Sequence, residues 1–388
     1  MKYTQGNPVS AEFSSGQALS SFSQFFSDKG LSIFDYTKIN PHIRTLYEVP
    51  QRSGYLLLQA FCLKTNLQDN LDCCVIDYVD NNQIQAYAAS QHGLHYVGIS
   101  HCLPILFQTL FQYLMRNGNP FSMNEPDELV ADYAFSLSLP TADTEQERIQ
   151  TIEQLIADTM PRERWQKIMA TKLAEIAVLF CFSHEISHIT YGHSELSSKR
   201  GSIGIWEISL TKNTQSKRIS NRLRQAWEIQ ADRAALALLH AYVNNHKEYK
   251  TRLLNTLKCD KKKNPTLQLM ARVAYAVSFV FFLFGQEAHS ISSTTSHPSI
   301  IIRRLFALEC IISYTLREVG HCCSEKEVTD AILEAANKAE KAWHRLGFTF
   351  NGDVLYKNEL SSVVDQLFRN DELSKQYLGH YQWAANLR

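Results

Sequence analysis

The stretch that decides the fold is LAEIAVLFCFSHEISHITYGH, residues 173–193, an apolar run that leads into an HExxH motif. Residues 173–182 are almost wholly apolar and contain neither Pro nor Gly, so the pattern predicts a buried helix. Gly192 follows the second His of the motif by four residues, and the segment beyond it is polar. This predicts one continuous core helix, which carries the motif near its C-terminal end.

The polar residues of this helix have the spacing of a metal site. His184 and His188 lie four residues apart, so their imidazoles share one face of the helix. Two neutral imidazoles on one face can bind Zn²⁺ from the same side and leave its opposite side open. Glu185 lies next to the first ligand, where it can reach a water activated by the metal without binding the metal itself. That is the position a general base needs.

A third ligand is expected downstream, in AWEIQADRAA at residues 226–235. Glu228 and Asp232 lie at i and i+4 on one helix face, so we predict Glu228 as a metal ligand. We predict that Asp232 accepts a hydrogen bond from the far ring nitrogen of a ligand His. The alternative for both is an ordinary pair of exposed acids. His193 is an alternative third ligand, but it follows His188 by only five residues, so we interpret it as a helix-end His favoured by the helix dipole.

HEISHITYGH followed by WEIQAD resembles the gluzincin metallopeptidases of the CAAX prenyl protease and heat-shock protease X type. That family pairs HExxHxxxxH with a downstream ExxAD. SHPSIIIR at residues 296–303 is similar to the family's THP motif followed by an Arg. The resemblance implies that His297 and Arg303 lie near the site, as donors to the oxyanion or organisers of the acids. The alternative is a helix-start loop and a surface Arg, and a Tyr such as Tyr191 is a further candidate donor.

The resemblance spans residues 80–310 and has one clear departure, because those relatives carry transmembrane helices. The longest apolar run here, VAYAVSFVFFLFG at residues 273–285, is shorter than the roughly 20 residues that a bilayer requires. We expect a buried core helix there and a likeness to the soluble, minimal members of the clan. The chain also resembles the Lit-type phage-exclusion proteases, soluble proteins that cleave a host translation factor, through HExxH and general character.

Composition limits the partners. Lys plus Arg number 39 and Asp plus Glu number 39, and this balance argues against a general nucleic-acid or acidic-lipid binder. The first 30 residues lack the basic and apolar regions of a signal peptide. Nine cysteines without a CxxC pair predict reduced, mostly buried thiols in a cytoplasmic protein. The alternative is a redox or second metal site at Cys73-Cys74 or at Cys322-Cys323, beside His321.

The whole pattern predicts an α+β fold, mainly α, in which a gluzincin-like zincin core of helices accompanies a small antiparallel sheet. We place an N-terminal region with a β-hairpin sheet and the first core helix at 1–145, the helical zinc-peptidase core at 146–346 and a helical tail at 347–388. Strands are expected at 55–63, 74–78, 84–88 and 95–99, with Asp80-Asn81-Asn82 as a hairpin turn, and at the edge segment 203–210. Helices are expected at 102–115, 144–159, 161–193, 217–243, 267–283, 298–317, 326–346 and 360–377.

These observations predict a zinc-dependent endopeptidase that acts on a protein or peptide substrate, with the edge at 203–210 available to pair with an extended peptide. One alternative is a catalytically silent interaction or regulatory module that keeps zinc for structure. Structural zinc sites are usually closed by four protein ligands, and the presence of Glu185 favours catalysis. Another alternative is a latent protease, regulated or of an anti-phage or toxin type. Substrate and oligomeric state stay open.

Overall fold

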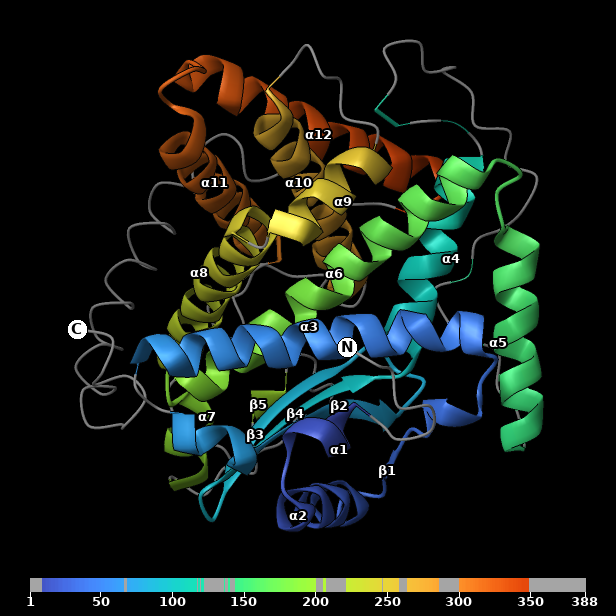
Figure 1. Ribbon diagram of the computed structural model, residues 1–388, viewed down its shortest axis with the longest axis vertical. Coiled ribbons are helices and arrows are strands. Elements are labelled where there is room, and N and C mark those ends of the chain that lie inside the picture. The colour runs from blue at the N-terminus through green and yellow to red at the C-terminus, as the bar shows by residue number, and fades with distance from the viewer. Residues whose placement is uncertain are drawn as a thin grey trace.

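The computed structural model describes residues 9–65, 68–116, 118, 120–121, 136, 139, 144–199, 205–206, 221–245, 247–257, 264–285 and 300–348. Its longer helices are α2 (Gly16–Ser27), α3 (Pro41–Thr65), α4 (Cys102–Arg116), α5 (Glu145–Thr159), α6 (Arg164–Thr190), α8 (Asn221–Asn245), α9 (Lys247–Thr256), α10 (Pro265–Phe284), α11 (Ile300–Val319) and α12 (Glu325–Arg345). The shorter helices are α1 (Ser10–Phe13) and α7 (His193–Lys199), and the strands are β1 (Ser32–Ile33), β2 (Cys74–Asp80), β3 (Ala86–Gln91), β4 (Leu94–Ser100) and β5 (Ile205–Trp206). The fold is α+β and mainly α, as the sequence predicts (Figure 1).

Helix α6 runs through the centre of the molecule and is buried from Leu173 to its end, whereas its first turns are partly exposed. It packs against α3, α4, α8 and α10 and against β3 and β4. A helix that is apolar on every side is stable only when neighbours surround it, which explains its central place. The predicted start at Pro161 is wrong, because Glu163 is the N-cap and forms a capping box with Gln166.

The sheet is mixed, with the strand order β1-β2-β4-β3-β5. Strand β2 pairs in parallel with β4, so the predicted hairpin between β2 and β3 is wrong, as is a purely antiparallel sheet. The tight hairpin joins β3 to β4. Its two turn residues, His92 (φ 52°) and Gly93 (φ 78°), are both left-handed, as a two-residue turn that matches the strand twist requires. The loop of residues 81–85 instead carries the chain past β4 to the far side.

The two faces of the sheet are buried by different helices, because side chains alternate along each strand. Val75, Val79, Tyr87 and Tyr96 pack with the phenylalanines of α2. Their neighbours along the strands pack in the main core together with residues of α6. In Figure 1 the sheet accordingly lies between α2 below it and α6 above it. Strand β3 therefore has the HExxH helix directly against one of its faces.

The strand expected at residues 55–63 is wrong, because these residues belong to the 25-residue helix α3. Tyr55, Leu58 and Cys62 are all buried in the main core and lie three to four residues apart, which is helical spacing. A short apolar run has the same composition in a strand and in a buried helix. The first half of α3 is more polar, so the apolar run alone does not reveal the length of the helix.

Helices α4, α5, α8, α10, α11 and α12 lie close to their predicted positions, whereas α1, α2, α7 and α9 were not predicted. Thr144 and Glu147 form the predicted capping box at the start of α5. Among the described helices, only α10 is long and apolar enough to cross a membrane. Most of its apolar stretch is buried inside the protein. It packs against α6, α11 and α12, as a core helix does. The predicted tail helix at 360–377 lies outside the described residues.

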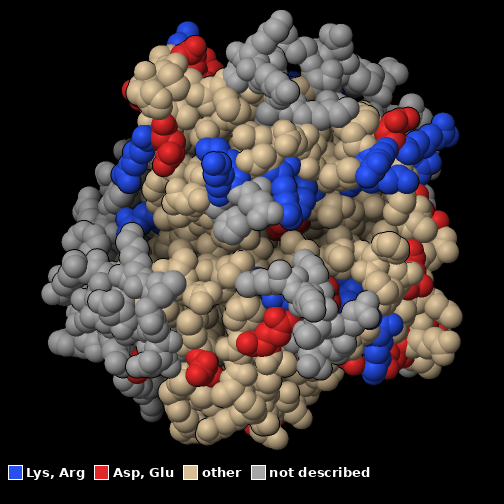
Figure 2. Space-filling view, in the orientation of Figure 1, with Lys and Arg blue, Asp and Glu red and all other residues tan. Residues whose placement is uncertain are grey.

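The surface and the cysteines agree with the composition. Figure 2 shows acidic and basic side chains scattered among uncharged residues on one face of the molecule. Eight of the nine cysteines lie in the described residues, and all eight are free thiols. Five of them are buried, as predicted for reduced cysteines that act as small apolar residues.

Candidate metal centre

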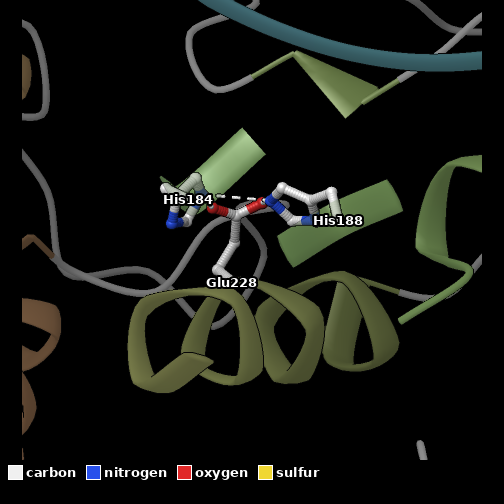
Figure 3. A group of neighbouring side chains, drawn as sticks. All are labelled: His184, His188 and Glu228. Atoms are coloured by element: carbon white, nitrogen blue, oxygen red, sulfur yellow. Dashed lines mark hydrogen bonds and ion pairs between the residues drawn. The ribbon is translucent and has the colours of Figure 1, made fainter. Parts of the chain in front are cut away.

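Three side chains predicted to bind a metal converge where α6 crosses α8. His184 and His188 extend from one face of α6, and the carboxylate of Glu228 on α8 lies between their two rings (Figure 3). One ligand atom from each residue falls within 4.8 Å of the others. All three residues are only 1% exposed. The group can therefore hold a metal ion in the interior of the protein.

The distances between the donor atoms fit a tetrahedral ion. His184 Nε2 lies 3.1 Å from His188 Nε2. Glu228 lies with one carboxylate oxygen 3.4 Å from His184 Nε2 and the other 3.6 Å from His188 Nε2. Ligands bound tetrahedrally at about 2.0–2.2 Å are separated by roughly 3.3–3.6 Å, so the donor separations are close to those around a zinc-sized ion.

The electrostatics of the site also suit a cation. Burial lowers the pKa of His188 well below its usual range, and the neighbouring His184, His193 and Arg303 lower it further, against the attraction of Glu228. His188 is therefore neutral at physiological pH. A neutral imidazole offers a lone pair to a metal, whereas an imidazolium does not.

The other ring nitrogen of His184 is held by Asp232. His184 Nδ1 lies 2.9 Å from Asp232 Oδ1, as the sequence predicts for an acid one turn after Glu228. Asp232 is wholly buried. Burial by itself would raise the pKa of Asp232, but Arg303 and His184 outweigh that effect and hold the pKa below its usual range. Asp232 is thus an anion that can fix the tautomer and orientation of His184.

Arg303 lies on α11 and joins the two acids. Its Nε and one terminal nitrogen each donate to a different oxygen of Asp232 at 2.8 Å. Its other terminal nitrogen lies 3.3 Å from Glu228 Oε2. The residue is 2% exposed, so it is not a surface Arg. These contacts join Arg303 to both acids. His297, the second residue of the predicted motif, lies outside the described residues.

The interpretation of His193 as a helix-end His is wrong. Helix α6 ends at Thr190, Gly192 turns the chain with a φ of 75°, and His193 begins the short helix α7. His193 is 0% exposed, and its Nδ1 lies 3.0 Å from Nδ1 of His188. The left-handed turn, which the sequence signals through Gly192, folds α7 back beside the metal ligands.

Two residues that surround His193 were not foreseen. Gln230 Oε1 lies 3.0 Å from His193 Nε2, and the indole of Trp227 stacks on the imidazole with ring centroids 5.1 Å apart. Both belong to the WEIQAD stretch that supplies Glu228 and Asp232. Helical spacing predicts that i and i+4 share a face, but it does not show that another segment packs against the intervening residues.

Glu185 is buried beside the triad at 1% exposure. It lies on α6, which packs against β3 and β4. The pKa of Tyr87 on β3 is raised to about 12, chiefly by burial, with the negative charge of Glu185 adding to the effect. The carboxyl of Glu185 is thus close enough to β3 to act on that strand electrostatically.

The comparisons with known proteins agree with a peptidase. The sequence model of the family described as Peptidase U49, the Lit-type protease family, matches residues 123–315. The matched span contains the whole triad, Asp232 and Arg303. No curated protein and no solved structure matches the chain. The match supports a hydrolase that acts on a protein substrate, and it agrees with the Lit-type resemblance. The resemblance to the CAAX-type gluzincins stays a prediction.

Proposed function

We propose that this protein is a zinc-dependent endopeptidase whose ion is held by His184, His188 and Glu228. The observation that carries the proposal is the buried triad, with donor separations of 3.1, 3.4 and 3.6 Å. Helix α6, which supplies its two histidines, also supplies Glu185. The Peptidase U49 match supports the reaction class independently of this geometry. Three protein ligands leave a coordination position for the substrate, as catalytic zinc sites do.

The roles of the protein residues follow from their positions. When bound, zinc supplies polarisation of the scissile carbonyl and acidifies a water molecule. Glu185, adjacent to His184 in the chain, takes the proton of the attacking water and passes it to the leaving amine. Asp232 and Arg303 hold His184 and Glu228 in position through the contacts at 2.9, 2.8 and 3.3 Å. Neither of these two residues needs to touch the substrate.

The substrate chain is proposed to pair with the sheet edge. Strand β5 pairs antiparallel with β3, Trp206 opposite Tyr87 and Ile205 opposite Ala88, and among the described residues it is the last strand of the sheet. Helix α7, which begins with His193, contacts both β3 and β5. An extended peptide added to this edge would lie on the side of the sheet that adjoins the metal centre. The rest of the segment 203–210 lies outside the described residues.

Glu185→Gln tests the proposal. The amide keeps the size of the carboxyl group but cannot take the proton, so the variant should retain zinc and lose cleavage by at least about 10²-fold. Wild type and variant would be incubated with an unfolded casein and with a purified translation factor, the substrate class that the Lit-type resemblance implies, and the products identified by mass spectrometry. Cleavage by the wild type that zinc chelation leaves intact, or that Glu185→Gln retains in full, would contradict the proposal.

A further inference from the structure

The two ligand histidines have different partners behind them. His184 Nδ1 is held by the carboxylate of Asp232 at 2.9 Å, whereas His188 Nδ1 faces a second imidazole, that of His193, at 3.0 Å. His193 in turn faces the amide oxygen of Gln230 through its Nε2 at 3.0 Å. A chain of polar groups therefore runs from the metal ligand His188 through His193 to Gln230. All three side chains are at most 1% exposed.

The donor and acceptor roles of His188, His193 and Gln230 fix the position of each proton. His188 offers Nε2 to the triad, so its proton sits on Nδ1, and that N–H can only donate. His193 Nδ1 must then accept, and the proton of His193 sits on Nε2. That N–H donates to Gln230 Oε1, an oxygen that can only accept. In this arrangement each of the two contacts joins a donor to an acceptor, and both imidazoles are neutral.

We propose that His193 is a positioning residue of the metal centre, which holds His188 in the tautomer and orientation that bind the ion. The inference rests on the proposed metal site but goes beyond the HExxH and acid ligands. A hydrogen-bond acceptor behind a metal-bound His raises its basicity and fixes its ring, and loss of such a partner typically weakens metal binding about 10–100-fold.

The surroundings of His193 keep its ring fixed. Trp227 stacks on it with an interplanar angle of 13°. The next residue, Ser194, lies 2.6 Å from the hydroxyl of Ser90 on β3, oxygen to oxygen. Ser90 Oγ in turn lies 2.8 Å from Nδ1 of His95 on β4. Helix α7 is thus anchored both to α8 and to the sheet. A ring held on two sides orients His188 without further loss of side-chain entropy when the metal binds.

The contrast with His184 explains why this partner matters. Asp232 is an anion held by two hydrogen bonds from Arg303, so the orientation of His184 is secured by charge. His193 is neutral, and hydrogen bonds between neutral groups are about half as strong as those to ionised ones. The His188 side of the site therefore depends on the geometry of α7, and it is the side that a change at His193 should loosen.

The test compares two substitutions, one that keeps a hydrogen-bond acceptor for His188 and one that does not. His193→Asn can place its amide oxygen where Nδ1 lies and so keep an acceptor for His188, although it loses the contact to Gln230. His193→Phe keeps the ring stacked on Trp227 but has no acceptor. His240→Phe makes the same change on α8 at a His whose ring contacts Tyr314, and it serves as the matched control. The full-length chain would be used throughout.

Zinc affinity would be measured by competition with a chromophoric chelator, and Co²⁺ would report ligand geometry through its visible absorption. We expect His193→Phe to bind zinc about 10–100-fold more weakly with an altered Co²⁺ spectrum. His193→Asn should stay within about threefold of wild type, and His240→Phe should equal it. Circular dichroism would show that each variant is folded.

Three outcomes would overturn the inference. Wild-type affinity in His193→Phe would show that no acceptor is needed. Equal weakening in His193→Asn and His193→Phe would show that the acceptor is not the property that matters. A wild-type chain that binds no zinc would overturn this inference and the proposed function together. Tight zinc binding without peptide cleavage would overturn the proposed function alone.

Discussion

Replacement of Arg303 by Met tests the electrostatic logic of the site. Methionine keeps much of the apolar volume but removes the guanidinium that contacts Asp232 twice at 2.8 Å and Glu228 at 3.3 Å. Both acidic residues are at most 1% exposed. Without Arg303 and without metal, two buried anions face each other with only the ligand histidines to compensate them. We expect the metal-free protein to lose stability for that reason.

The size of the loss can be worked from these contacts. A pair of unit charges about 4 Å apart contributes roughly 4 kcal/mol at an effective dielectric constant of 20. Removal of one partner from a buried ion pair costs about 3–5 kcal/mol in comparable cases. His184 beside Asp232 can gain a proton and offset part of this. We therefore expect a decrease of about 3 kcal/mol in the free energy of unfolding at pH 7.

Arg304→Met is the matched control. Like Arg303, Arg304 is buried on α11 and lies over a phenylalanine ring of α10. The guanidinium carbon of Arg304 lies 4.8 Å from the ring centroid of Phe282, and that of Arg303 lies 5.8 Å from the ring centroid of Phe281. Its acid, Glu340, has a side chain that is 25% exposed and stays solvated when the Arg is lost. We expect a decrease of only about 1–2 kcal/mol for this variant, because no buried anion is left behind.

Urea unfolding of the chelator-treated proteins would measure both losses at pH 7 and pH 5. Removal of Arg303 should raise the pKa of Asp232 in the folded state above its unfolded value. The penalty should therefore shrink as the pH falls and the folded state gains a proton. The Arg304→Met loss should change little. Equal losses in the two variants, or an Arg303→Met loss that is the same at both pH values, would refute the reasoning.

Three further predictions concern stability. Burial raises the pKa of Asp77 from 3.8 to about 6, so stability should fall by roughly 3 kcal/mol as the pH rises from about 4 to 6, and Asp77→Asn should flatten that dependence in urea unfolding. Gly98→Ala would place a methyl group 2.8 Å from Val79 and 2.9 Å from Phe26 and should cost about 1–3 kcal/mol, measured as a lowered Tm. Ser324→Ala removes the capping box of α12 and should cost about 1 kcal/mol, and an unchanged Tm would show that the cap does not contribute.

The central helix and the ligands could be predicted because the information is local. The apolar run before HExxH defines one buried helix, and spacings of four residues put His184 beside His188 and Glu228 beside Asp232 on their helix faces. The contact between Asp232 and His184 followed from the chemistry that a ligand His requires. Arg303 was reached through a motif, and its burial between the two acids gives that prediction its physical content.

The errors came from long-range pairing. The sequence of residues 74–99 does not show that β2 pairs with β4 rather than with β3. A short loop after β2 is compatible with a β2–β3 hairpin and also with a connection that passes over β4. His193 was misread for the same reason. Its role depends on the turn at Gly192 and on the packing of α7 against Trp227, and neither has a sequence period. Contacts between segments distant in the chain decide both cases.

Zinc content tests the central claim most directly. Wild type, Glu228→Ala and Glu309→Ala would be purified without added metal and equilibrated at the same free zinc concentration. The zinc content per chain of each protein would then be measured. Glu309 is an exposed acid of α11 and serves as the control. The account predicts about one zinc per chain in the wild type and in Glu309→Ala, and a large loss in Glu228→Ala. No zinc in the wild type, or full occupancy in Glu228→Ala, would contradict a site built from His184, His188 and Glu228.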